Sequence, residues 1–220
     1  GRFPNARNVE ELWSILEGGV DAITDVPADR FDWREIYAAE KASGKSIGKW
    51  LGAMPGIAEF DSLFFEISPL EAERMDPRQR HLLQESWLAL EAAGYGPSQI
   101  AANRIGMFVG VEEGGDYQRR LTEVSLTASH TGILAARLAY FLDLKGPVLA
   151  VNTACSSALV ALHLACQSLL QNECDTAIAA GVNLLVSAEA YIGMSQAGML
   201  SPNGKCYAFD QRADGMVPGE

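Results

Sequence analysis

The residues best suited to chemistry lie in the segment VNTACSSALVALHLACQSLL, from Val151 to Leu170. Its first residues end an apolar run typical of a buried strand. The residues after Cys155 predict a helix that is apolar on nearly every face and is therefore expected to be buried. This order places the Cys155 sulfur at a helix N-terminus, where unpaired backbone N–H groups carry partial positive charge and favour the thiolate. Because the thiolate is the nucleophilic form, the pattern predicts covalent chemistry at Cys155.

The neighbours of the cysteine are predicted to support it. Thr153 and Ala154 form a sharp turn after the strand, and Ser156 and Ser157 open the helix. Their small side chains leave room for a substrate, and the backbone N–H of Cys155 would donate to the oxyanion of a tetrahedral intermediate. We therefore predict a nucleophile elbow with Cys155 as the catalytic residue and Thr153, Ala154 and Ser156 as its support. The alternative is a structural Cys155 that acts as a small buried hydrophobe.

A catalytic thiolate usually needs a base, and the chain contains three histidines. His163 is eight residues along the same predicted helix, about 12 Å away by the helical rise, which is too far. His81 is expected on the solvated surface, and His130 in a loop or a helix cap. The sequence therefore supplies a nucleophile without a base, and we expect the base to lie beyond Glu220.

Composition and charge narrow the class of protein. The 220 residues are 48% hydrophobic and carry a net charge of −11 that is spread along the chain. This distribution argues against binding to nucleic acid or to an acidic membrane surface, since both need clustered cations. Four cysteines without a C-x-x-C pair or a histidine at zinc spacing predict reduced thiols in a cytoplasmic protein, with no metal site.

The wider pattern alternates buried strands with helices, which predicts an α/β layered fold with parallel strand pairing. Strands are expected at 104–111, at 148–153 and at 175–187, the last apolar enough to be the central one. A glycine-rich turn is expected after the first strand, at 112–115. Helices are expected at 8–17, at 131–145 and after Cys155.

The clearest helix follows Met75. Asp76 is predicted as its N-cap, Pro77 as its first residue, Gln79 as the residue that closes a capping box, and Gly94 as its end. The chain opens without a strand before its first helix and closes within a loop. We expect residues 1–220 to be a single domain fragment of a longer polypeptide.

The active-site segment GPVLAVNTACSSALVALHLACQSL resembles that of β-ketoacyl synthases, the condensing enzymes of fatty acid and polyketide assembly. FFEISPLEAERMDPRQRHLLQESWLALEAAGY, Phe64 to Tyr95, is similar to the Asp-Pro-x-Gln-Arg helix of the family. GMLSPNGKCYAFDQRADGMVPGE, Gly198 to Glu220, is similar to its segment after the nucleophile. The start of the chain resembles ketosynthase domains of modular type I polyketide synthases.

The resemblance implies a thiolase-like layered αβαβα fold, of which this chain covers the N-terminal half and part of the second half. It implies that Cys155 is the acylated nucleophile, and that the catalytic histidines lie in motifs absent from this sequence. The implied partners are an acyl carrier protein with its phosphopantetheine arm, acyl and malonyl thioesters, further domains of a larger synthase, and a second copy in a homodimer. Residues 128–140 would lie near the dimer interface. No cofactor of its own is implied.

The ending DGMVPGE, with Pro218 where many members of the family carry Arg, resembles synthases whose acyltransferase is a separate protein. The predicted activity is decarboxylative condensation of a Cys155-bound acyl chain with a malonyl-type extender. Two alternatives remain open: a ketosynthase that transfers acyl chains without elongation, and a catalytically silent structural half-domain. Carrier proteins of the family are typically acidic, so docking needs a local basic patch, for which Arg78 and Arg80 or residues outside this sequence are candidates.

Overall fold

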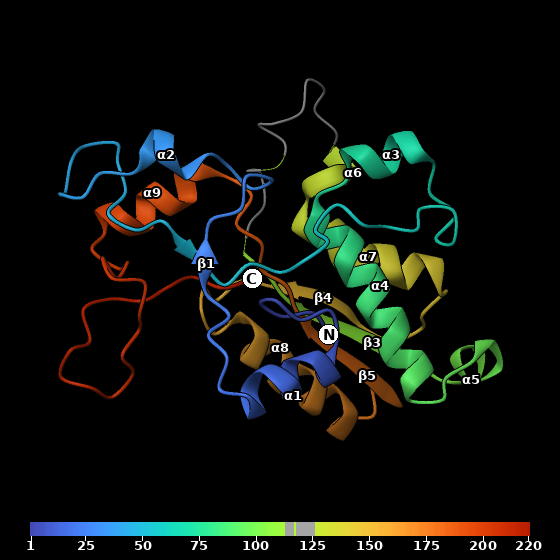
Figure 1. Cartoon of the computed structure of the whole chain (residues 1–220). Coiled ribbons are helices and arrows are strands. Elements are labelled where there is room, and N and C mark those ends of the chain that lie inside the picture. The colour runs from blue at the N-terminus through green and yellow to red at the C-terminus, as the bar shows by residue number, and fades with distance from the viewer. Residues whose placement is uncertain (113–116, 118–125) are drawn as a thin grey trace. The chain divides into compact units, whose positions relative to one another are not determined.

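A computed structural model describes residues 1–112, 117 and 126–220. The chain divides into two compact units, Gly1–Gly56 with Leu184–Glu220, and Ile57–Asn183, and each has its own hydrophobic core. The helices and strands are labelled in Figure 1. In chain order they are α1 Val9–Glu17, β1 Thr24–Asp25, α2 Trp33–Ile36, β2 Trp50–Leu51, α3 Pro69–Arg74, α4 Pro77–Ala92, α5 Pro97–Ala102, β3 Ile105–Gly110, α6 Leu126–Ser129, α7 Thr131–Phe141, β4 Val148–Val151, α8 Ser157–Leu170, β5 Thr176–Gly181 and α9 Ala188–Gln196.

The unit formed by residues 57–183 contains a parallel sheet with the strand order β4-β3-β5. Its three strands confirm the predicted strands and their parallel pairing. The prediction that the strand at 175–187 is central is wrong, because β3 lies in the middle. That strand is also shorter than predicted. It stops at Gly181, which pairs with Gly110, the last residue of β3, and the next backbone N–H, that of Val182, donates to the Gly110 carbonyl oxygen at 3.2 Å.

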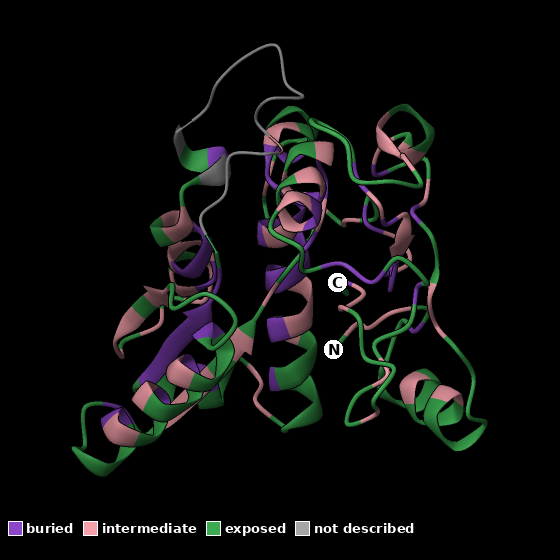
Figure 2. Ribbon diagram, turned by 90° about the vertical axis from the view of Figure 1, so that its left-hand side faces the viewer, coloured by how far each residue is buried: buried purple, intermediate pink, exposed green. Residues whose placement is uncertain are grey.

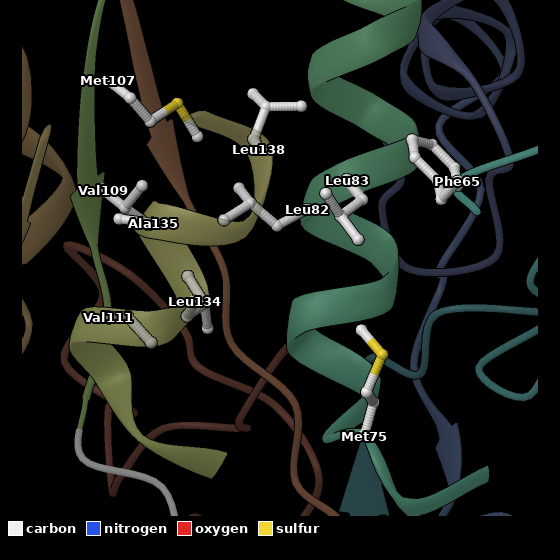
Figure 3. Close-up of a cluster of buried hydrophobic side chains, with 10 residues drawn as sticks. All are labelled: Phe65, Met75, Leu82, Leu83, Met107, Val109, Val111, Leu134, Ala135 and Leu138. Carbon is white, nitrogen blue, oxygen red and sulfur yellow. The ribbon is translucent and has the colours of Figure 1, made fainter. Parts of the chain in front are cut away.

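Both faces of this sheet are covered by helices, with α8 on one side and α4 and α7 on the other (Figure 1). Side chains of a strand point alternately to the two faces. Met107 and Val109 accordingly join the cluster formed with α4 and α7 in Figure 3, whereas Phe108 packs against Ala161 and Ala165 of α8. All six residues of β3 are therefore buried, as the purple strand in Figure 2 shows.

The start of α4 differs in one detail from the prediction. Asp76 caps the helix by accepting from the backbone N–H of Arg78 at 2.9 Å, and Gly94, with φ at +78°, follows its end as predicted. Gln79 does not close a capping box. Its Nε2 donates to the Thr127 carbonyl oxygen at 3.2 Å, and its Oε1 accepts from Arg137 Nε at 2.8 Å. Gln79 thus joins α4 to the segment before α7 and to α7 itself.

The other unit, residues 1–56 with 184–220, is organised around a buried ion pair. The Glu220 carboxylate accepts from Arg30 Nε at 2.7 Å and Nη2 at 2.6 Å, and from the backbone N–H groups of Met54 at 2.9 Å and Leu185 at 3.1 Å. The exposed fraction of the side chain is 1% for Arg30 and 0% for Glu220. Burial acts to lower the pKa of Arg30, but the hydrogen bonds and charges of Glu220 and Asp29 outweigh it and raise that pKa. One carboxylate therefore joins three separate segments.

Glu220→Gln is expected to lower the free energy of unfolding by about 3–5 kcal/mol, because it leaves the buried guanidinium of Arg30 without its counter-charge. Urea unfolding of the native polypeptide that carries this chain measures the change. Asp210→Asn is the matched control, since the Asp210–Arg212 pair is exposed and exposed pairs contribute little to stability. Equal and small shifts of the unfolding midpoint in both variants would contradict this role of Glu220.

Candidate active site

Cys155 lies beyond the carboxyl end of β4 and directly before Ser156, the N-cap residue of α8. The carboxyl ends of parallel strands are where open α/β sheets bind their ligands. The side chain of Cys155 is exposed, so it is not a buried core residue of this chain. The dipole of the 14-residue helix α8 presents its positive end to this position.

The turn that carries Cys155 is strained at one residue. Ala154 has φ at +54°, in the left-handed region that residues with a Cβ rarely adopt. Its backbone N–H donates to Asn152 Oδ1 at 3.0 Å. On the other side of the cysteine, Ser156 Oγ lies 2.9 Å from both the carbonyl oxygen and the Oγ1 of Thr153. The three predicted support residues therefore all lie in this turn, and side-chain hydrogen bonds hold it.

Ser157 also belongs to the turn. Its Oγ accepts from the backbone N–H of Thr153 at 2.9 Å and lies 2.6 Å from the Ala154 carbonyl oxygen, to which it donates. The sequence indicated Ser157 only as a small residue that opens the helix, and it did not point to Asn152. Both types commonly bond backbone groups a few residues away, so an asparagine after a strand and a serine at a helix start were the available signals.

Two glycines allow α8 to approach the sheet closely at this point. Gly110 and Gly181 are paired at the carboxyl ends of β3 and β5. A Cβ at Gly110 would lie 2.4 Å from the backbone of Ser157 and Ala158, and one at Gly181 would lie 2.9 Å from the Ala158 Cβ. The first turn of α8 therefore lies directly on strand backbone, and this contact fixes the position of the turn that precedes it.

Ala154→Gly is expected to raise the free energy of unfolding by about 1 kcal/mol, because release of the left-handed strain outweighs the added freedom of the unfolded chain. Ala89→Gly, at an exposed position inside α4, is the control and is expected to lower it by about 1 kcal/mol. Urea unfolding measures both. A destabilising Ala154→Gly would show that the turn is not strained.

Gly110→Ala is expected to lower the free energy of unfolding by about 3 kcal/mol, since the atoms that the new Cβ meets are backbone and cannot rotate away. Gly193→Ala is the matched control, because it lies inside α9 with no atom within 4 Å of the new Cβ. Helix propensity predicts that Gly193→Ala raises the free energy of unfolding by up to about 1 kcal/mol. A tolerated Gly110→Ala would contradict close contact between α8 and β3.

The helix after Cys155 is less buried than its composition suggests. One face, with Ser157, Ala161, Ala165 and Ser168, packs on the sheet. On the opposite side Leu159 and Leu170 have exposed fractions of 71% and 75%. The sequence-based expectation of a buried α8 is therefore wrong for this chain, because the described residues cover only one of its apolar faces.

The three histidines make contacts that do not involve Cys155. His130 caps α7 through its Nδ1, which accepts from the backbone N–H of Gly132 at 3.1 Å, as expected. His163 is exposed on α8. The surface role predicted for His81 is wrong: it is 3% exposed, and its Nε2 lies 2.9 Å from the carbonyl oxygen of Ile57. In the described part of the chain no histidine is hydrogen-bonded to Cys155.

The candidate docking residues are not free cations. Arg78 forms an ion pair with Asp76 at 2.7 Å, with 11% of its side chain exposed. Arg80 is 8% exposed, and burial lowers its pKa. These two arginines therefore do not form the predicted basic patch.

Residues 1–112, 117 and 126–220 contain no group of three or more histidine, cysteine or acidic side chains arranged to hold a metal ion. Among them, too, no helix has the length and apolarity needed to cross a bilayer. The glycine-rich turn predicted at 112–115 lies outside the described residues, except for Glu112.

Comparison with known proteins identifies the family. The model described as "Beta-ketoacyl synthase, N-terminal domain" matches residues 1–220. The chain belongs to the β-ketoacyl synthase family. Polyketide synthase ThaG of Burkholderia thailandensis is 54% identical over 221 residues, and polyketide synthase PksM of Bacillus subtilis is 46% identical over the same length. Both matches cover the whole chain, but the chain spans only 4% of ThaG and 5% of PksM.

Solved ketosynthase structures share the fold. The oxazolomycin ketosynthase domain OzmH KS7 of Streptomyces albus superposes with a TM-score of 0.93 at 37% identity. The ketosynthase from module 6 of the bacillaene synthase of Bacillus subtilis, solved as a cysteine-to-serine variant, gives 0.91 at 43% identity. These matches cover all of this chain and 39% and 37% of those chains. The α/β arrangement of β3, β4, β5 and their helices is thus the N-terminal part of the thiolase-like ketosynthase fold.

Proposed function

We propose that this chain carries the nucleophile of a ketosynthase that condenses a Cys155-bound acyl chain with a malonyl-type extender in polyketide assembly. One observation carries the proposal: in a member of the β-ketoacyl synthase family, an exposed cysteine stands at the N-terminus of α8, beyond the carboxyl ends of parallel strands. Three cysteines of the chain are exposed, but only Cys155 has this setting.

In the first half-reaction the Cys155 thiolate attacks the carbonyl carbon of an acyl thioester on the phosphopantetheine arm of a carrier protein. The carbonyl oxygen becomes an oxyanion, which the backbone N–H of Cys155 stabilises. The intermediate collapses with loss of the carrier thiolate, which leaves an acyl-Cys155 thioester. Sulfur is both nucleophile and leaving group, so the exchange is nearly balanced in energy.

In the second half-reaction a malonyl thioester on a carrier protein loses carbon dioxide. The resulting carbanion attacks the acyl-Cys155 carbonyl carbon and forms the new carbon–carbon bond. The Cys155 thiolate leaves, and the β-ketoacyl product remains on the carrier. The histidines that assist these steps in the family lie in motifs outside residues 1–220, so this chain supplies the nucleophile and the donor beside it.

The wider setting is part of the same proposal. The family model spans residues 1–220, which supports assigning both compact units to one ketosynthase domain. We propose a homodimer with residues 128–140 near its interface, an acyl carrier protein as partner, further synthase domains, a cytoplasmic location, and no metal or cofactor in the domain itself. Pro218 in DGMVPGE supports a synthase with a separate acyltransferase.

Cys155→Ala is expected to abolish condensation, because none of the other three cysteines of residues 1–220 lies at the N-terminus of α8. The test uses intact-mass spectrometry of the native polypeptide, charged with an acyl thioester and then given malonyl-loaded carrier protein. We expect Cys155 to gain the acyl mass and to lose it as β-ketoacyl product forms on the carrier. Cys166→Ala removes another exposed cysteine on α8 and is expected to leave the reaction intact.

The outcomes of this experiment separate the alternatives. Acylation of Cys155 without extended product would show a ketosynthase that transfers chains without elongation. A polypeptide that is never acylated, and whose synthase is unaffected by Cys155→Ala, would be a silent structural half-domain. Either result would contradict the proposed condensation.

A further inference from the structure

We propose that Ser157 is a positioning residue, whose hydroxyl orients the peptide between Ala154 and Cys155 so that the Cys155 N–H faces the developing oxyanion. The proposal rests on the proposed acylation of Cys155. Ser157 itself does not touch the substrate. It acts through the backbone N–H of the nucleophile itself.

The hydroxyl of Ser157 has both of its hydrogen-bonding roles filled. It is 6% exposed, donates to the Ala154 carbonyl oxygen at 2.6 Å and accepts from the Thr153 N–H at 2.9 Å. The backbone N–H of Ser157 donates to the same Ala154 oxygen at 3.0 Å. One residue of α8 therefore holds the carbonyl of Ala154 with two donors.

Because the peptide is planar, the two hydrogen bonds to the Ala154 carbonyl also set the direction of the Cys155 N–H. A trans peptide is planar, and its C=O and N–H bonds point to opposite sides of the chain. The Ala154 carbonyl and the Cys155 N–H belong to the same peptide. Because Ser157 draws the carbonyl toward the first turn of α8, the Cys155 N–H must point away from that turn. Under the proposed role, the oxygen of an acyl group on the exposed Cys155 lies on this same side.

This orientation of the Cys155 N–H needs hydrogen bonds to hold it, because the turn is strained. Ala154 is held in the left-handed region, which is strained for a residue with a side chain. Without the Ser157 hydroxyl, rotation of the peptide is opposed by fewer bonds. Ser157 in turn is fixed by its close contact with Gly110 on the sheet. The sheet therefore holds the direction of the Cys155 N–H through Ser157.

Two reactions of the same sulfur distinguish a positioning role from a structural one. Acylation by a carrier-free acyl N-acetylcysteamine thioester builds an oxyanion and needs the N–H. Alkylation by iodoacetamide displaces iodide at a saturated carbon and builds none. Loss of a single oxyanion donor costs about 10²–10³ in rate, so partial misorientation by Ser157→Ala should slow acylation at least about tenfold. Alkylation of Cys155 should change less than about threefold.

Three variants of the native polypeptide carry the test. Ser157→Thr keeps the hydroxyl and is expected to retain acylation within about threefold of the parent. Ser168→Ala is the matched control: Ser168 lies on the same helix, is 2% exposed, and its Oγ accepts from Cys174 Sγ at 3.4 Å, far along α8 from Cys155. It is expected to leave the ratio of acylation to alkylation unchanged.

A parallel fall of acylation and alkylation in Ser157→Ala, or an unchanged ratio between them, would overturn the positioning role. A loss in Ser157→Thr as large as in Ser157→Ala would overturn the role of the hydroxyl. Failure of the proposed acylation, on which the inference rests, looks different, because Cys155 of the unaltered protein would then gain no acyl group at all.

Discussion

Backbone contact between the first turn of α8 and the carboxyl end of the sheet is the constraint on which the site depends. Gly110 and Gly181 are paired across β3 and β5, and a Cβ at either would collide with residues at the start of α8. Their lack of side chains lets the helix begin directly on the strands. The chain must therefore pass from the end of β4 into α8 within a few residues, and this short connection is the turn that carries Cys155.

The sharp turn explains its unusual conformation and its many hydrogen bonds. Ala154 takes a left-handed conformation, and Asn152, Ser156 and Ser157 bond backbone groups that a looser loop would leave to water. Strain of this kind persists only where the surrounding structure determines it, and it is concentrated at functional sites. Exposure alone would not single out this cysteine, because Cys166 and Cys206 are exposed as well. What distinguishes Cys155 is the fixed turn and the helix end beside it.

Much of this could be predicted from the sequence, and the failures have physical causes. Apolar runs and caps predicted the strands and α4, and the small residues around Cys155 predicted the elbow. Strand order could not be predicted, because the apolarity of a strand indicates how buried it is and not which strands lie beside it. For this reason the central position expected for β5 was wrong. His81 was expected at the surface because a polar side chain bonded to a distant carbonyl leaves no local signal. Ser157 was expected only to open the helix, because its bond to the Ala154 carbonyl depends on an orientation that only the structure shows.

Mapping the site of acylation by peptide mass spectrometry, after brief exposure of the native polypeptide to an acyl thioester, tests the central claim most directly. The four cysteines compete within one molecule, so their differing exposure and geometry are compared under identical conditions. If the geometry of the turn makes Cys155 the reactive cysteine, the acyl group will be found on Cys155 alone, with Cys166 and Cys206 unmodified. Acyl groups shared among the three exposed cysteines would contradict the account, because exposure and not the geometry of the turn would then decide reactivity.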